Sequence, residues 1–225
     1  MAHFPFDIVG FDLDGTLVDS NRDLAPAINH ALGLIGRAPI SPDATRKLIG
    51  GGARKMLERA VELTGGELPD TEFEHIYGAL LVHYEAHIAD NTVAYPGCVA
   101  ALEALEARGC KLAVVTNKIE TYSRKLLSAL DLTRHFAVVI GGDTLGPGHA
   151  KPARDMIDEA IDRCGGGRFA MVGDSTYDVR AAKNAEVPVV ALSFGYNDVP
   201  AHEMGADVVI DSYGQLVRAL EGLGA

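Results

Sequence analysis

Six short runs rich in Val and Ile recur along this chain of 225 residues, and helix-like segments separate most of them. The runs are continuously apolar, which is typical of strands buried on both faces of a parallel sheet. We therefore predict an α/β fold with a doubly wound parallel sheet. The predicted strands are Ile8–Leu13, Lys111–Thr116, Phe136–Ile140, Phe169–Gly173, Val187–Ser193 and Asp207–Ile210.

The segment 20–89 interrupts this alternation, because it contains several helical patterns and no strong strand. Ser20 and Asp23 resemble a capping box, and Ser41-Pro42 is typical of a helix start. An all-helical cap is thus inserted after the first strand, with hinges where the chain enters and leaves it. The predicted domains are an α/β core of residues 1–18 and 92–225 and a cap of residues 19–91. The predicted cap helices include Leu24–Leu34, Ala53–Leu63 and Thr71–Ile88.

Composition narrows the class of protein. The net charge of -11 argues against nucleic acid as a partner, because phosphate backbones are bound by basic surfaces. No apolar run reaches the length of about 18 residues that a membrane span needs, and we see no signal peptide. The three cysteines form no CxxC pair, which is typical of reduced thiols in the cytoplasm. We expect a cytoplasmic monomer or homodimer without a zinc site, since the histidines show no ligand spacing.

Residues 12–16 read Asp-Leu-Asp-Gly-Thr and directly follow the first predicted strand core. In an extended chain Asp12 and Asp14 project to the same side. Two carboxylates at a strand end are costly unless they hold a metal or perform chemistry. One could attack a substrate while the other handles a proton. The structural alternative is an Asx turn that ends the strand.

Two further motifs lie at or after strand ends, where doubly wound folds bind ligands. Thr116 and Asn117, followed by Lys118, could bind phosphate oxygens at a helix N-terminus, or they are an ordinary helix start. Lys151, before Pro152, could place its ammonium over a phosphate and a carboxylate. The alternative for Lys151 is a solvated side chain.

Asp174 and Asp178 follow another predicted buried strand. Together with Asp12 and Asp14, Asp174 would form an oxygen-rich site of the kind that suits Mg²⁺. Asp178 could N-cap the next helix or support the metal from outside its ligands. Tyr177 is expected at the surface, and the alternative is a contact with the cap as a lid.

In this order and placement, the motifs resemble those of the haloacid dehalogenase (HAD) superfamily of phosphotransferases, over the whole chain. The similarity is greatest to the phosphoglycolate phosphatase-like members with a helical cap. The residues that indicate this subgroup are Asn117-Lys118, Gly141-Gly142-Asp143 and the glycine-rich stretch 49–53.

This resemblance implies a Mg²⁺-dependent phosphomonoester hydrolase. Asp12 would be the nucleophile and form an aspartyl-phosphate. Asp14 would protonate the leaving alcohol and then activate water. Lys151 would neutralise the charge of Asp12 and the phosphate, which Thr116 and Asn117 would hold. Mg²⁺ would be bound by Asp12, the backbone carbonyl of Asp14, and Asp174.

The cap is expected to choose the leaving group. Four basic residues flank the turn Gly50-Gly51-Gly52 in an otherwise acidic chain, and glycine N–H groups attract anions. We therefore expect Gly51, Gly52 and Arg54 to bind a second negative group of the substrate, such as the carboxylate of phosphoglycolate. The alternative is a flexible loop with solvated charges. The four basic residues are Arg46, Lys47, Arg54 and Lys55.

Other functions are compatible with the same core. They are hydrolysis of another small sugar phosphate, β-phosphoglucomutase-like transfer, and non-catalytic binding of a phosphorylated ligand. A dehalogenase should not need Asp14, and a phosphonate hydrolase would need a Schiff-base lysine, for which Lys47 and Lys55 have no wider motif. A binding module would be expected to lack a core acid or Lys151, and none is missing.

Overall fold

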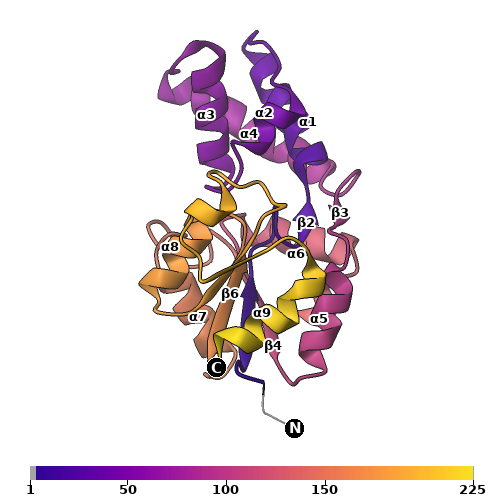
Figure 1. Ribbon diagram of the computed structural model, residues 1–225. Coiled ribbons are helices and arrows are strands. Elements are labelled where there is room, and N and C mark those ends of the chain that lie inside the picture. Colours follow the sequence, from indigo (N-terminus) through magenta and orange to yellow (C-terminus); the bar gives the residue numbers. More distant parts are fainter. Residues whose placement is uncertain (1–3, 225) are drawn as a thin grey trace.

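The computed structural model describes residues 4–224, and a parallel six-stranded sheet with the order β5-β4-β1-β6-β7-β8 lies at its centre (Figure 1). All six predicted strands are confirmed, most of them shorter by one or two residues at an end. Strand β1 is fully buried between β4 and β6, which explains its continuous apolar run. The strands are β1 (Ile8–Phe11), β4 (Lys111–Val115), β5 (Val138–Ile140), β6 (Phe169–Gly173), β7 (Val189–Leu192) and β8 (Val208–Ile210).

Helices cover both faces of the sheet and bury a hydrophobic core on each, so the doubly wound arrangement is confirmed. One face is covered by α5 (Cys98–Glu106), α6 (Glu120–Ala129) and α9 (Leu216–Leu223). The other is covered by α7 (Asp155–Arg163) and α8 (Thr176–Asn184). No helix in residues 4–224 has the length and apolar character needed to cross a bilayer.

Four helices stand over the end of the sheet where its strands finish, as Figure 1 shows in purple. In this cap α1 packs against α4, and α2 and α3 contact α1. The short strands β2 (Val18–Asp19) and β3 (Val93–Ala94), which the sequence patterns missed, pair antiparallel where the chain enters and leaves the cap. The cap helices are α1 (Asn21–Leu34), α2 (Pro42–Arg46), α3 (Ala53–Gly65) and α4 (Asp70–Ala86).

The capping box predicted for Ser20 and Asp23 is wrong. Ser20 makes no side-chain cap bond, and its hydroxyl donates instead to Asp14 Oδ1 at 2.5 Å. The Asp23 carboxylate accepts from the backbone N–H groups of Asn91 and Thr92, at 3.0 and 2.8 Å, and from the Thr92 hydroxyl at 2.6 Å. Both side chains therefore stabilise the crossings into and out of the cap rather than the start of α1.

Close packing of the sheet leads to a first prediction, at Gly10 of β1. A Cβ atom at Gly10 would lie 2.2 Å from Cζ of the buried Phe169 ring. Gly10→Ala should therefore lower the free energy of unfolding by roughly 1–3 kcal/mol, the usual cost of overpacking. The matched control is Gly33→Ala on α1, where nothing lies within 4 Å of the added atom. Urea unfolding should show the control unchanged or stabilised by up to about 1 kcal/mol; equal stability of the two variants would contradict the packing argument.

Candidate active site

Adjacent strands bring the motif residues to one edge of the sheet. Asp12 follows β1, Thr116 follows β4 and Asp174 follows β6, and these strands are direct neighbours. Lys151 comes from the loop before α7, which begins at Asp155. The strand order of the parallel sheet thus brings residues that are distant in sequence together in one cluster below the cap.

The Lys151 ammonium lies at the centre of this cluster, and the residue is only 3% exposed. Its Nζ donates to Asp12 Oδ1 at 2.9 Å, to Asp178 Oδ1 at 2.5 Å and to the carbonyl of Val115 at 2.7 Å. Burial alone would lower the pKa of Lys151, but the carboxylates of Asp12 and Asp178 outweigh it and raise the pKa. Lys151 therefore stays charged, and these three bonds use all of its donors.

Three buried carboxylates offer oxygen atoms within 4.8 Å of one another, from Asp12, Asp174 and Asp178. Burial raises the pKa of Asp12 to about 6, with Asp178 adding to the effect and Lys151 opposing it. Burial and the charges of Asp178 and Asp12 likewise raise the pKa of Asp174. Such crowding of negative charge fits a hard divalent cation, which prefers oxygen ligands.

Asp178 caps α8 from its third helical position rather than as the N-cap, and its support of a metal stays a prediction. Its Oδ2 accepts from the N–H and the hydroxyl of Ser175, at 3.0 and 2.7 Å, in a capping box. Its Oδ1 accepts from Lys151. The start of α8 is therefore fixed by the same carboxylate that helps to hold the lysine.

Asp14 points away from the three-carboxylate cluster and toward the cap side of the site. Its carboxylate accepts from the Ser20 hydroxyl at 2.5 Å and from Lys118 Nζ at 2.9 and 3.1 Å. Burial would lower the pKa of Lys118, but Asp14 and Tyr84 raise it, so this second ammonium also stays charged. Binding of a metal by the Asp14 backbone carbonyl stays a prediction.

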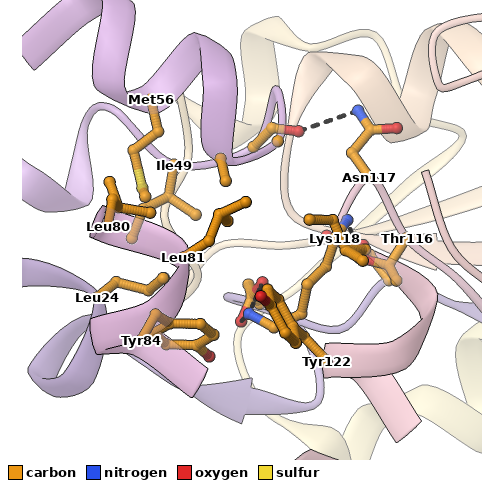
Figure 2. A pocket seen from close by; sticks show the side chains of 16 residues that line it. Leu24, Ile49, Met56, Leu80, Leu81, Tyr84, Thr116, Asn117, Lys118 and Tyr122 are labelled. Carbon is orange, nitrogen blue, oxygen red and sulfur yellow. Dashed lines mark hydrogen bonds and ion pairs between the residues drawn. The ribbon is translucent and has the colours of Figure 1, made fainter. Parts of the chain in front are cut away.

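Thr116 and Asn117 lie where the phosphate motif placed them. The Thr116 hydroxyl is buried and accepts from the backbone N–H of Lys118 at 3.3 Å. The Asn117 amide donates to the carbonyls of Lys151, at 3.0 Å, and of Gly50 in the cap, at 3.1 Å (Figure 2). Its Oδ1 is buried and has no hydrogen-bond partner within residues 4–224. Asn117 thus joins the core motif to the cap.

A pocket of about 540 Å³, including its open mouth, lies between the cap and these core residues (Figure 2). Asp12 and Asp14 line it together with Thr116, Asn117 and Lys118. The cap wall is apolar except for one hydroxyl, that of Tyr84 on α4. The side chains that form this wall are Leu24, Ile49, Ala53, Met56, Leu80, Leu81 and Tyr84.

The structure does not bring Arg54 into the pocket, contrary to the expectation that it binds substrate. Its guanidinium makes a two-point pair with Glu74, at 2.8 and 2.9 Å, and lies 4.6 Å from the ring centroid of Tyr77. Gly52 does line the pocket, whereas a Cβ at Gly51 would lie 3.0 Å from Tyr177 Oη. The glycine turn therefore allows close approach of cap and core, and anion binding by Gly51 and Gly52 stays a prediction.

Tyr177 belongs to this contact, so its expected surface position is wrong. Arg59 of α3 donates to Tyr177 Oη at 3.1 Å, and Lys55 Nζ lies 5.3 Å from the centroid of its ring. The motif loop after β6 thus reaches the cap through an aromatic side chain.

Sequence reasoning missed Tyr196 altogether. Its backbone N–H donates to Asp174 Oδ2 at 2.6 Å, while its hydroxyl donates to Asp19 at 2.7 Å and accepts from the Asn21 N–H at 2.8 Å. This residue follows β7 and connects the carboxylate cluster to the entrance of the cap. Its position shortly after a strand end was the only available signal.

An α/β core with a charged cluster at the strand ends and an inserted helical cap defines the architecture of a capped phosphotransferase. Residues 9–192 match the profile of the haloacid dehalogenase-like hydrolases. The chain is 43% identical over 212 residues to a phosphoglycolate phosphatase of Agrobacterium fabrum, covering 93% of this chain and 90% of that protein. It is 40% identical over 213 residues to one of Caulobacter vibrioides, covering 94% and 89%.

Solved structures agree with this. The crystal structure of a predicted phosphoglycolate phosphatase from Haemophilus somnus superposes with a TM-score of 0.87 at 31% identity, covering 96% of this chain and 98% of that one. The chain belongs to the haloacid dehalogenase-like hydrolase family, as its motifs predicted, and it is a phosphatase.

The carboxylate cluster predicts a pH-dependent response to Mg²⁺. The pKa of Asp12 is raised to about 6, so a cation must displace a proton from it at lower pH. Mg²⁺ should therefore raise the Tm clearly at about pH 7.5 and much less at about pH 5, because proton and cation compete for the same carboxylate. Thermal unfolding with and without Mg²⁺ measures this, and Asp174→Asn should respond little at either pH. A response equal at both pH values would show that the cation binds elsewhere.

Proposed function

We propose that this phosphatase is a Mg²⁺-dependent phosphomonoester hydrolase that works through a phosphorylated Asp12 and acts on phosphoglycolate. The observation that carries the proposal is the buried Lys151 ammonium between Asp12 and Asp178, next to a pocket that Asp12 lines and the cap covers. The relatives named phosphoglycolate phosphatase support the substrate. The free, buried cysteines fit the proposed cytoplasmic setting.

Asp12 is the proposed nucleophile because its carboxylate lines the pocket while Lys151 holds one of its oxygens. A carboxylate approaches a phosphate dianion only where positive charge offsets their repulsion. Asp12 and Asp174, with the Asp14 backbone carbonyl, would hold Mg²⁺ beside Asp178, and the ion would supply part of that charge. Lys151 supplies the rest from the protein.

Asp14 is the proposed acid and base. Lys118 and Ser20 hold its carboxylate at the pocket, two residues beyond the nucleophile. It would give a proton to the leaving oxygen in the first half-reaction and take one from water in the second. Thr116 and Asn117 would hold the transferred phosphoryl group, since both line the pocket together with Asp12.

The cap wall favours a small leaving group over a sugar. A polyhydroxylated leaving group needs hydrogen-bonding partners, and buried hydroxyls without them lose affinity. Among the cap side chains that line the pocket, only Tyr84 has a hydroxyl. This observation weighs against sugar phosphatase and β-phosphoglucomutase-like activities. The intact set of Asp12, Asp14, Asp174 and Lys151 weighs against a non-catalytic binding module.

The nucleophile is tested by Asp12→Asn, which removes the attacking charge and little else. Turnover of phosphoglycolate should fall by roughly 10⁴-fold or more, as for other lost nucleophiles. The fold should survive. Folding raises the pKa of Asp12 to about 6, so at neutral pH the ionised carboxylate lowers the stability of the metal-free protein, and the neutral amide of asparagine does not have this cost. We therefore expect the metal-free variant to melt no lower than the wild type at neutral pH. Steady-state kinetics beside thermal unfolding gives both values; activity within tenfold of the wild type would reject the assignment.

The dual role of Asp14 is tested by Asp14→Asn in rapid-quench experiments. Acid and base catalysis each contribute about 10²–10⁴-fold, so both phosphorylation of Asp12 and its hydrolysis should slow by factors of that order. Acid-quenched enzyme analysed by peptide mass spectrometry reports the amount of phosphorylated Asp12 with time. If both half-reactions keep the wild-type rate, Asp14 has no proton-transfer role.

A further inference from the structure

The pocket contains one positive charge whose donors are not all used. Of the described residues that line it, only Lys118 carries a cationic side chain. Lys151 lies below the pocket with its three donors committed to Asp12, Asp178 and Val115. The basic residues near the glycine turn are not among the lining residues, and Arg54 is paired with Glu74. A second negative group of the substrate, besides the phosphate, can therefore pair with only one cationic side chain among the described lining residues, that of Lys118.

Lys118 is held in place by Asp14, but not all of its hydrogen-bond donors are used. Its side chain is 7% exposed, and its Nζ donates to the two carboxylate oxygens of Asp14 at 2.9 and 3.1 Å. An ammonium has three donors, so one remains for a ligand. The ammonium also lies 4.4 Å from the ring centroid of Tyr84, which comes from the opposite side of the pocket (Figure 2).

The Tyr84 hydroxyl is the second hydrogen-bond donor, besides the Lys118 ammonium, that could contact a ligand in this pocket. Tyr84 is 2% exposed, and its Oη makes no hydrogen bond of normal geometry among residues 4–224, although it lies close enough to the Lys118 ammonium for each group to shift the pKa of the other. A buried hydroxyl without a partner is uncommon, because leaving it unsatisfied costs free energy. Tyr84 lines the ligand pocket, where a bound group could accept a hydrogen bond from this hydroxyl. The other cap side chains in this wall are apolar and offer no competing side-chain donor.

We propose that Lys118 and Tyr84 together form the subsite that recognises a carboxylate on the leaving group. One ammonium and one hydroxyl donor match the two acceptor oxygens of a carboxylate. Lys118 directly follows Thr116 and Asn117 in sequence, so this subsite adjoins the proposed phosphoryl site and suits a carboxylate close to the ester oxygen. The inference rests on the proposed function. It assigns to Lys118 and Tyr84 the binding of the second negative group of the substrate, which the sequence led us to expect of Arg54.

The subsite also spans the two parts of the molecule. Tyr84 lies on α4 of the cap, and Lys118 lies just after β4 of the core. A carboxylate bound to both would favour the closed arrangement of cap and core, in which water is excluded from the reacting groups. A substrate without the carboxylate would lack this link.

The test compares phosphoglycolate with hydroxyethyl phosphate, which replaces the carboxylate by a neutral alcohol. In the wild type, kcat/KM should favour phosphoglycolate. Lys118→Met should reduce that preference by roughly 10- to 100-fold, the factor expected for a lost charge-assisted hydrogen bond. Tyr84→Phe, which removes one hydroxyl and leaves Asp14 untouched, should reduce it by about 3- to 10-fold, mainly through KM. The ratio of the two substrates separates recognition from any loss of Asp14 function in Lys118→Met.

Two control variants match these changes outside the pocket. Tyr77→Phe removes a hydroxyl from the same helix as Tyr84, and Lys47→Met removes an exposed cap charge. Both should keep the wild-type preference. If kcat/KM in Lys118→Met and Tyr84→Phe falls by the same factor for both substrates, the proposed subsite is overturned and the proposed function stays intact. A wild type that hydrolyses hydroxyethyl phosphate but not phosphoglycolate would overturn the proposed substrate and the subsite together.

Discussion

The buried ammonium of Lys151 is the charge on which the catalytic edge of the sheet depends. It connects the residue after β1, the last carbonyl of β4 and the first turn of α8. Without it, Asp12 and Asp178 would be buried carboxylates in close contact, and breaking a buried pair typically costs about 3–5 kcal/mol. Gly173 lets the carboxylate of Asp178 approach β6, because a Cβ there would lie 2.4 Å from Asp178 Cβ. The sheet order places these groups together, and the lysine makes their proximity stable.

The cap is connected to this edge through the same loops that carry the chemistry. Ser20, at the start of the cap, holds Asp14, and Tyr196 connects Asp174 to Asp19 at the same crossing. Asn117 joins the Lys151 and Gly50 carbonyls. A movement of the cap would therefore change the surroundings of several site residues at once. The physical reason is that one short crossing, β2, separates the nucleophile from the first cap helix.

The sequence predicted the sheet and the positions of the motif residues well, because both depend on strong local signals. A continuously apolar run leaves few alternatives to a buried strand, and polar residues after several such runs must meet where parallel strands end. The domain boundaries rest on the break in the strand–helix alternation, and the chemical role of each site residue rests largely on the resemblance. They stay predictions until the experiments above are done.

What the sequence could not predict depends on tertiary partners. Ser20 and Asp23 have the spacing of a capping box, but their bonds to Asp14 and to residues 91–92 are formed across the fold. The charge of Arg54 is visible in the sequence, whereas its pairing with Glu74 is not. Tyr84 has the helical spacing of an ordinary core residue, and only the three-dimensional structure shows that its hydroxyl is unpaired beside a ligand pocket. Side chains shared between cap and core were thus the hardest to assign.

Charge balance shows why leaving-group selection and proton transfer would meet at one residue. Four carboxylates, Asp12, Asp14, Asp174 and Asp178, face two ammoniums when all are ionised. A divalent cation at the three-carboxylate cluster would balance that excess, and the phosphoryl group would then depend on the cation and Lys151. A further negative group on the substrate would have Lys118 left to pair with, and Lys118 already holds Asp14. The Lys118 ammonium that binds a substrate carboxylate would therefore also position Asp14, the acid that protonates the leaving oxygen. Recognition of the leaving group and cleavage of its bond to phosphorus would then depend on the same lysine.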